Sequence, residues 1–367
     1  MAQESLLDLV QQRLDEYCAE QRLKLDEISP EIVELITFAQ DLLAGGKRLR
    51  AQFCYWSWAG YALERISEPQ LESQTRGIIG IAAALEMFHG AALVHDDLLD
   101  QSDTRRGLPA VHRRFEELHA RQAFAGDSVR FGVAGSVLVG DLMLAWSSEI
   151  FGLAVASAVD PEREKRCRDE FSQMRFEVMA GQYLDILEEN AAPLRSAQEM
   201  LLRANRVMLY KTAKYSLEAP LLIGAAFGGA TTDELHALSS FGIPLGMAFQ
   251  LRDDLLGVFG DPAVTGKPAG DDLREGKRTV LIGLTLELLQ PSVAKIFSEL
   301  LGQPELADDQ LEFLQQAIID SGARDRAESM IEEYARQSLG ALESIRMDSH
   351  AKSQLTALAA AAINRKH

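Results

Sequence analysis

The chain has 367 residues, of which 47% are hydrophobic and 25% are charged. This is the composition of a globular protein, and it excludes a disordered, collagen-like or coiled-coil chain. Acidic residues outnumber basic ones by 55 to 37, which gives a formal net charge of −18. Nucleic acids and anionic membrane surfaces are therefore not expected partners. Three scattered cysteines without metal-ligand spacing fit reduced thiols in a cytoplasmic protein.

Helices are expected almost throughout the chain. Apolar residues recur on one helical face over residues 6–17 and again over residues 311–318, where Gly322 is expected to end the helix. Pro220 and Pro244 lie inside apolar runs and are expected to start or kink buried helices. No sustained apolar–polar alternation and no Asn-Gly or Asp-Gly turn is present, so the sequence predicts no sheet.

The longest apolar stretch, residues 77–94, contains Glu86 and His89 and runs into the sequence His-Asp-Asp. A membrane-spanning helix would not tolerate these residues, so a buried core helix is expected and no stable membrane insertion. The acidic N-terminus lacks the basic start of a signal peptide. Residues 118–131 are expected to form a loop. No repeat or shift in composition marks a boundary, so we predict one all-α domain over residues 1–367.

The first chemical signal is the acidic turn in VHDDLLDQSDTRRG, residues 94–107. Asp96 and Asp100 are one helical turn apart and share a face, with Asp97 beside them. Three like charges on one turn repel one another unless a cation lies between them, and carboxylates of this kind suit Mg²⁺ together with phosphate oxygens. Taken alone, the same pattern also fits a solvated helix end.

A second acidic pair, Asp253 and Asp254, again ends an apolar helical stretch. The loop after it is rich in Gly, Pro and Asp and contains Lys267 and Lys277. Two facing acidic helix ends would hold one metal–diphosphate cluster between them. The loop taken alone also fits a charged surface segment.

A third patch is GGKRLR, residues 45–50, where two glycines precede Lys47, Arg48 and Arg50. The spacing is not that of a Walker phosphate-binding loop. By itself the patch fits a glycine helix cap with solvated basic residues. Together with Arg106 it would hold a second diphosphate that carries no metal.

These motifs resemble the all-trans polyprenyl diphosphate synthase family, and most closely its geranylgeranyl diphosphate synthases. The resemblance covers nearly the whole chain, in order: GGKRLR, LEMFHGAALVHDDLLDQSDTRRG, VLVGDLML, GQYLDI, YKTAKYS, FQLRDDLLGVFGD and GKPAGDDLREGKRT. It implies a single all-α bundle of many helices around a deep central cavity, in a homodimer. It also implies a Mg²⁺-dependent transferase of isoprenoid biosynthesis that condenses isopentenyl diphosphate with allylic diphosphates.

The resemblance further implies the roles of individual residues. Three Mg²⁺ ions would be bound together with the substrate, and the residues implied to hold them are Asp96, Asp97, Asp100, Asp253 and Asp254. The residues implied to contact the allylic diphosphate are Arg105, Lys211 and Lys267. Isopentenyl diphosphate would be held by Lys47, Arg50, His89 and Arg106, while Thr212 and Gln250 would lie against the developing carbocation and Lys277 would help to close the site. Gln182 and Asp185, in GQYLDI, fit either a supporting role around the site or a purely structural one.

The residues of the helix before Asp96 indicate the length of the product. In shorter-chain members of the family a bulky residue four or five positions before this aspartate blocks the growing tail, and here Ala91 and Ala92 leave that place open. Phe88 lies about 12 Å before Asp96 along the helix, and its side chain points in a direction between those of Ala91 and Ala92. It is therefore the candidate residue for closing the end of the cavity that holds the growing tail. The sequence therefore predicts geranylgeranyl diphosphate, with farnesyl or longer chains as alternatives.

The second acidic motif departs from the family pattern, because Gly257 stands where a third aspartate is usual. This leaves open a non-catalytic regulatory subunit of a synthase. A terpene cyclase is a further alternative, but it would not need GGKRLR, His89 and Arg106. An assay of the chain alone separates these three possibilities.

Overall fold

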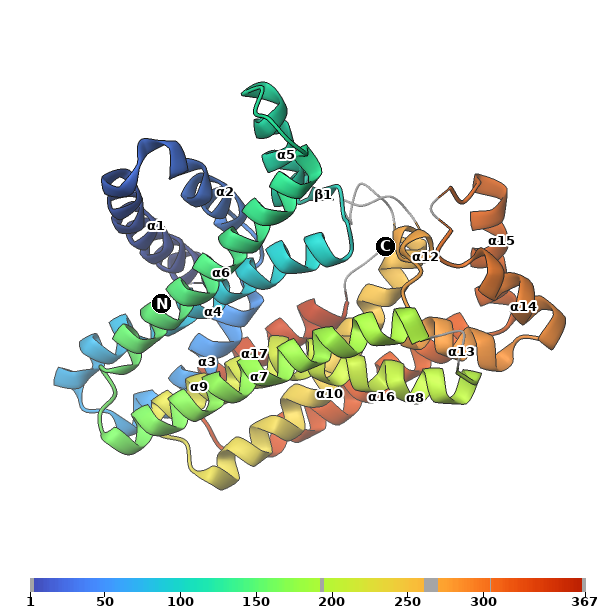
Figure 1. The fold of residues 1–367 in the computed structure, drawn as a ribbon. Helices are drawn as coiled ribbons and strands as arrows, with labels where there is room; N and C mark the ends of the chain where they lie inside the picture. Colours follow the sequence, from blue (N-terminus) through green and yellow to red (C-terminus); the bar gives the residue numbers. More distant parts are fainter. Residues whose placement is uncertain (1–2, 192–194, 261–269, 304, 365–367) are drawn as a thin grey trace. The chain divides into compact units, whose positions relative to one another are not determined.

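The computed structural model describes residues 3–191, 195–260, 270–303 and 305–364, and these residues divide into two compact units. The first comprises Met1–Trp58 and Arg65–Lys165, and the second Ala59–Glu64 and Arg166–His367. The described residues are almost entirely helical, which confirms the predicted all-α class (Figure 1). The prediction of one domain over the whole chain stays a prediction.

The first unit is built from long helices and one very small ribbon. Its elements are α1 (Gln3–Ile28), η1 (Pro30–Ile32), α2 (Val33–Leu43), α3 (Leu49–Arg65, shared with the second unit), α4 (Glu68–Leu99), β1 (Thr104–Arg105), β2 (Leu108–Pro109), α5 (Val111–Arg121) and α6 (Ser128–Val155).

Helices α4 and α6 form the centre of this unit and run antiparallel along most of their length (Figure 1). Small residues allow this close approach. A β-carbon on Gly80 of α4 would lie 2.7 Å from Ala154 Cβ of α6, and one on Gly140 of α6 would overlap the His95 ring of α4. Helix α4 is therefore packed closely against the backbone of α6 up to its acidic C-terminal end.

Two helices, α4 and α6, are long and apolar enough to cross a membrane by length and composition alone. In the most apolar window of α4, however, 83% of the residues are buried inside the protein, as the sequence predicts for a core helix. The corresponding window of α6 is 39% buried.

Two expectations about the first unit are wrong. Residues 118–131 do not form one loop: α5 continues to Arg121 and α6 begins at Ser128, because the Asp127 side chain accepts from the Val129 and Arg130 amides and caps the helix. A ribbon is also present, although no sheet was expected, and it is made by a turn at Arg106 and Gly107.

The second unit surrounds helix α10. Its elements are α7 (Pro161–Ala191, of which the first turn belongs to the first unit), α8 (Ala197–Val207), η3 (Met208–Glu218), α9 (Ala219–Gly228), α10 (Thr232–Phe259), α12 (Asp271–Glu275), α13 (Val280–Leu288), α14 (Pro291–Leu300), α15 (Asp308–Asp320), α16 (Ala323–Ser344) and α17 (Ser349–Ile363).

Pro220 stands in the first turn of α9, which confirms that it starts a helix. Pro244 lies within α10, and the kink expected there stays a prediction. Gly322 follows the end of α15 with a left-handed φ of +80°, as expected of a helix-ending glycine. The segment η3 is an 11-residue π-helix, a rare form that is enriched at functional sites.

Candidate active site

The acidic turn lies at the C-terminal end of α4, where the buried helix emerges from the core of the first unit. The Asp100 amide donates to the Asp96 carbonyl at 2.8 Å, so the turn remains helical and both carboxylates share a face, as predicted. Asp97 is different, because it is only 2% exposed. The three aspartates thus have unequal access to a ligand.

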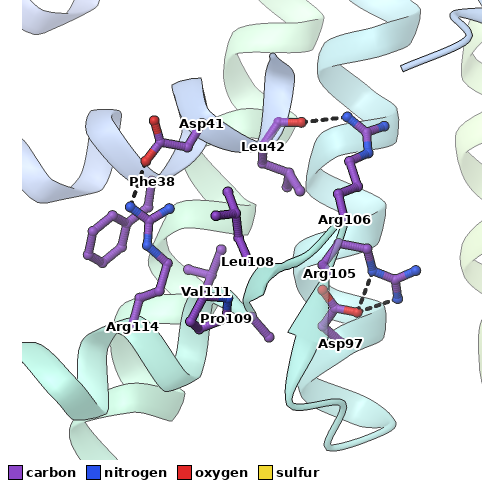
Figure 2. Close-up of a pocket in the computed structure, with 11 residues that line it drawn as sticks. Phe38, Asp41, Leu42, Asp97, Arg105, Arg106, Leu108, Pro109, Val111 and Arg114 are labelled. Carbon is purple, nitrogen blue, oxygen red and sulfur yellow. Dashed lines mark hydrogen bonds and ion pairs between the residues drawn. The ribbon is translucent and has the colours of Figure 1, made fainter. Parts of the chain in front are cut away.

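Asp97 is paired with Arg105, which comes from strand β1. Arg105 Nε donates to Asp97 Oδ1 at 2.8 Å, and Nη2 donates to the same oxygen (Figure 2). Asp96 Oδ2 lies 3.7 Å from Nη2. Burial disfavours the charge on Arg105, but the bonds to Asp97 outweigh it and raise its pKa. The arginine therefore stays charged beside the acidic turn, in contact with Asp97 and Asp96.

The turn between the two strands directs two neighbouring arginines to opposite sides. Arg106 and Gly107 have φ values of +54° and +78°, the pair of left-handed residues that a tight two-residue hairpin needs. Arg105 folds back onto Asp97, while Arg106 Nη1 donates to the Leu42 carbonyl at the end of α2, at 2.8 Å (Figure 2). This turn was not expected from the sequence, because Arg-Gly is a rarer hairpin signal than Asn-Gly.

Basic side chains of the first unit gather around His89 on α4. Burial, followed by the charges of Arg50, Arg106, Arg105 and Arg48, lowers the pKa of His89 well below 6.5. The imidazole is thus neutral near pH 7 and surrounded by positive charge. In a protein with a net charge of −18, such a cluster is complementary to an anion.

A chain of hydrogen bonds crosses the second unit. The Thr212 hydroxyl of η3 donates to Gln250 Oε1 of α10 at 2.7 Å, and Gln250 Nε2 donates to Asp254 Oδ1 at 2.8 Å. Asp254 is 4% exposed, and burial raises its pKa well above the usual value for a carboxyl group, despite the bond from Gln250. This chain fixes the orientation of the Gln250 amide.

Lys211 lies one residue before Thr212 on the π-helix and forms a 2.5 Å ion pair with Asp185 on α7. A β-carbon at Gly181, one helical turn before Asp185, would press into the backbone of residues 210 and 211. The small residue lets α7 approach the π-helix closely enough for the pair to form. Asp185, whose role the sequence left open, therefore orients Lys211.

In the second acidic pair, Asp253 is exposed and Asp254 is buried. The same division holds at the first pair, where Asp96 is the more accessible member. Lys277 contacts Glu275 at 2.7 Å and Asp272 at 3.8 Å. Lys267 lies outside the described residues.

The carboxylates fit a hard divalent cation only in part. Among the described residues, no group of three or more His, Cys, Asp or Glu side chains lies close enough to enclose a metal ion. Mg²⁺ often uses one or two protein carboxylates and takes its other ligands from water and phosphate. Asp96 and Asp100 on one helix face match that requirement, so these donors suit a cation that a diphosphate completes.

The remaining predicted residues are distributed as follows. The three proposed chain-length residues lie on one unbroken stretch of α4, with Phe88 and Ala91 buried and Ala92 half-buried. Of the basic patch, Lys47 is exposed and Arg50 is half-buried. The ligand roles of all these residues stay predictions.

Comparison with known proteins gives a consistent family. A family model described as polyprenyl synthetase matches residues 33–318. The geranylfarnesyl diphosphate synthase of Aeropyrum pernix is 31% identical over 86% of this chain and 89% of its own length. The geranylgeranyl diphosphate synthase of Sulfolobus acidocaldarius is 31% identical over 87% of this chain and 86% of its own. Among solved structures, a geranylgeranyl pyrophosphate synthase from Corynebacterium glutamicum, complexed with isoprenyl diphosphate and magnesium, matches with a TM-score of 0.91 at 35% identity over 100% of both chains.

Proposed function

Since the chain belongs to the polyprenyl synthetase family, we propose that it is a Mg²⁺-dependent prenyltransferase joining isopentenyl diphosphate head to tail to an allylic diphosphate. One observation carries this proposal: the first unit holds an acidic helix end beside a cluster of basic groups around His89. The acidic end suits a metal-bound diphosphate, and the basic cluster suits a diphosphate without metal.

The acidic groups divide into ligands and supports. We assign Asp96, Asp100 and Asp253 to direct metal binding, because they are the accessible members of the two clusters. Asp97 and Asp254 complete the clusters from buried positions. Three Mg²⁺ ions would neutralise the charge that develops on the departing diphosphate.

The cationic groups are oriented before substrate arrives. Arg105 is held by Asp97 and Lys211 by Asp185, so neither long side chain has to be ordered from solution when it binds the allylic diphosphate. Lys47, Arg50, His89 and Arg106 receive isopentenyl diphosphate.

Bond breaking leaves positive charge on the allylic carbon, and neutral oxygen atoms stabilise it there without forming a bond. The Thr212 hydroxyl and the Gln250 amide suit this task because their mutual hydrogen bond fixes them in place. The isopentenyl double bond attacks the cation, and the departed diphosphate takes up the proton that is lost. Lys267 also contacts the allylic diphosphate, and Lys277 helps to close the site and exclude water.

We propose geranylgeranyl diphosphate as the product. The relative named a geranylgeranyl diphosphate synthase supports this choice, whereas the one named a geranylfarnesyl diphosphate synthase supports the longer-chain alternative. Ala91 and Ala92 leave room below the acidic turn for a tail longer than fifteen carbons, and Phe88 limits it.

We also propose a cytoplasmic homodimer. Helix α6 carries exposed apolar residues at intervals of four: Val129, Val133 and Val137 are 53%, 41% and 38% exposed. This spacing forms a stripe along one face that a second copy would cover. Sedimentation of the wild type and of Val133→Asp tests this: a dimer that the variant converts to monomer supports the stripe as the interface.

The function is tested by incubating the purified chain alone with Mg²⁺, isopentenyl diphosphate and an allylic primer, then sizing the extracted product. We expect a linear twenty-carbon diphosphate, and a loss of at least ~100-fold in kcat for Asp96→Asn. Asp103→Asn, at a 77% exposed carboxylate, is the matched control. An inactive chain would support the regulatory subunit, and a cyclic hydrocarbon formed without isopentenyl diphosphate would support a cyclase.

A further inference from the structure

Arg48, in the middle of the basic patch, differs from its neighbours Lys47 and Arg50. It is 6% exposed, whereas Lys47 is exposed and Arg50 half-buried. Its φ is +49°, in the left-handed region that few residues other than glycine adopt, and it stands immediately before the first residue of α3. Burial and backbone strain both cost free energy, so its surroundings must stabilise this conformation.

The Arg48 guanidinium joins three helices. Nη2 donates to the carbonyl of Leu43, the last residue of α2, and to Gln11 Oε1 of α1 at 2.5 Å. Nη1 donates to Glu86 Oε2 of α4 at 3.4 Å. The side chains of this ion pair are only 4% and 5% exposed. The charge of Arg48 is therefore neutralised inside the unit and is not presented to a ligand.

The second oxygen of Glu86 serves the start of α3. Glu86 Oε1 accepts from the Ala51 amide at 3.2 Å, one of the helix N-terminal amides that have no partner within the helix. The same carboxylate thus caps α3, which carries Arg50, and pairs with Arg48. His89 follows three residues later on the same face of α4.

Further contacts fix the turn on either side of Lys47. Gln52 Nε2 donates to the Lys47 carbonyl at 2.6 Å, and Arg106 Nη1 donates to the Leu42 carbonyl at 2.8 Å. The carbonyl of Lys47 and the backbone near the end of α2 are therefore held, while the Lys47 side chain stays exposed.

We propose that Arg48 and Glu86 are a positioning pair, which holds Lys47 and Arg50 in the arrangement that receives the diphosphate of isopentenyl diphosphate. This role rests on the proposed function, and neither member of the pair touches substrate. Removing the Glu86 charge leaves a buried guanidinium without its counter-charge, which displaces the turn and with it both ligand side chains.

Three variants and one control test the pair. Glu86→Gln removes the charge but keeps an acceptor for the Ala51 amide. Arg48→Met removes the guanidinium, and Arg48→Lys keeps the charge but loses the forked donors. Glu72→Gln is the matched control: it makes the same substitution on the same helix, in a pair with Arg76 whose side chains are 83% and 76% exposed.

We expect Glu86→Gln and Arg48→Met to raise KM for isopentenyl diphosphate about tenfold or more, because misplacing binding groups by a fraction of an ångström is costly. Arg48→Lys should give an intermediate value. KM for the allylic diphosphate should change less than about twofold in all of them, and Glu72→Gln should change neither constant. Circular dichroism at the assay temperature checks that each variant is folded.

The inference is overturned if the variants lower only the melting temperature, or if they raise both KM values equally, since a merely structural role would act that way. Lys47→Ala separates this failure from that of the proposed function. If Lys47→Ala also leaves KM for isopentenyl diphosphate unchanged, the substrate does not bind at this patch. If it raises that KM while Glu86→Gln does not, only the positioning role is lost. Should Arg48→Met not fold, Glu86→Gln and Arg48→Lys decide the question.

Discussion

The carboxylate of Asp272 on α12 occupies the space beside Gly257 on α10: a β-carbon at position 257 would overlap Asp272 Oδ2. Position 257 is the place at which the second acidic motif lacks the usual third aspartate. A carboxylate is nevertheless present there, supplied from α12, and it contacts Lys277 at 3.8 Å. The glycine is therefore a docking position for the segment that follows, and its presence gives no support to a non-catalytic chain.

Restoring the aspartate should consequently harm the enzyme. Gly257→Asp would set two carboxylates in one space and push Asp272 away from Lys277, and we expect a loss of about tenfold in kcat/KM, which corresponds to ~1.4 kcal/mol. The double variant Gly257→Asp/Asp272→Gly should recover most of that loss. Asp271→Asn, on the neighbouring residue, is the control. A fully active Gly257→Asp enzyme would show that the two positions are independent.

Gly140 should tolerate no side chain, because its α-carbon lies against the ring of His95, the residue before Asp96. Gly140→Ala overpacks this contact, and we expect a loss of about 1–3 kcal/mol in the free energy of unfolding, together with reduced activity as the acidic turn shifts. Urea unfolding and steady-state assays measure the two effects. Gly340→Ala has open space around it and should instead stabilise by about 0.5–1 kcal/mol. Equal behaviour of the two variants would contradict the packing account.

Arg105 should be needed for stability as well as for binding. Arg105→Gln leaves the buried Asp97 carboxylate without its counter-charge, which costs about 3–5 kcal/mol in such pairs. Adding Asp97→Asn removes the stranded charge and should return a large part of that stability. Urea unfolding of the two single variants and of the double variant gives the coupling free energy between Arg105 and Asp97 directly. If the double loses the sum of the single effects, the pair does not interact in the folded protein.

His89 should make stability depend on pH on the acid side. Its pKa lies well below 6.5 in the folded chain, so below that pH the unfolded chain binds more protons and stability falls as pH decreases. Well above pH 6.5 the imidazole is neutral in both the folded and the unfolded state, so the dependence disappears there. Replacing His89 by Gln should reduce the slope of the free energy of unfolding against pH, below pH 6.5, by at most about 1.4 kcal/mol per pH unit. His236→Gln, at an exposed position, should leave the curve unchanged, and an unaltered acid limb in the His89 variant would assign the effect elsewhere.

The sequence predicts well where a local pattern decides the structure. The shared face of Asp96 and Asp100 follows from the helical period alone, and the placement of Pro220 at the start of α9 follows from backbone sterics. It predicts poorly where a tertiary contact overrides the local pattern. Nothing local in MLYKTAKYSLE signals a π-helix, which approaches α7 closely at Gly181 and α10 closely at Gly246.

Charged residues illustrate the same limit. Asp97 looks equivalent to Asp96 in the sequence, and Arg48 to Lys47, yet Asp97 and Arg48 are buried in ion pairs. Their partners stand 8 and 38 residues away along the chain. Sequence spacing shows which side chains share a helix face, but not which carboxylate or guanidinium a distant segment will neutralise.

Product length should respond to the residue that closes the tail path along α4. Phe88 lies about 12 Å before Asp96 on an unbroken helix, 2% exposed, and between the directions of Ala91 and Ala92. Phe88→Ala should shift the product beyond twenty carbons, Phe88→Leu should shift it partly, and Ala92→Phe should stop it at fifteen.

Phe297→Ala, at another fully buried phenylalanine, is the control for core truncation. Both alanine variants lose about 3–5 kcal/mol of stability, so the assays are run at reduced temperature. Chromatography of the dephosphorylated products reads out chain length. If Phe88→Ala gives the wild-type product while Ala92→Phe shortens it, the tail follows this helix but ends against another wall.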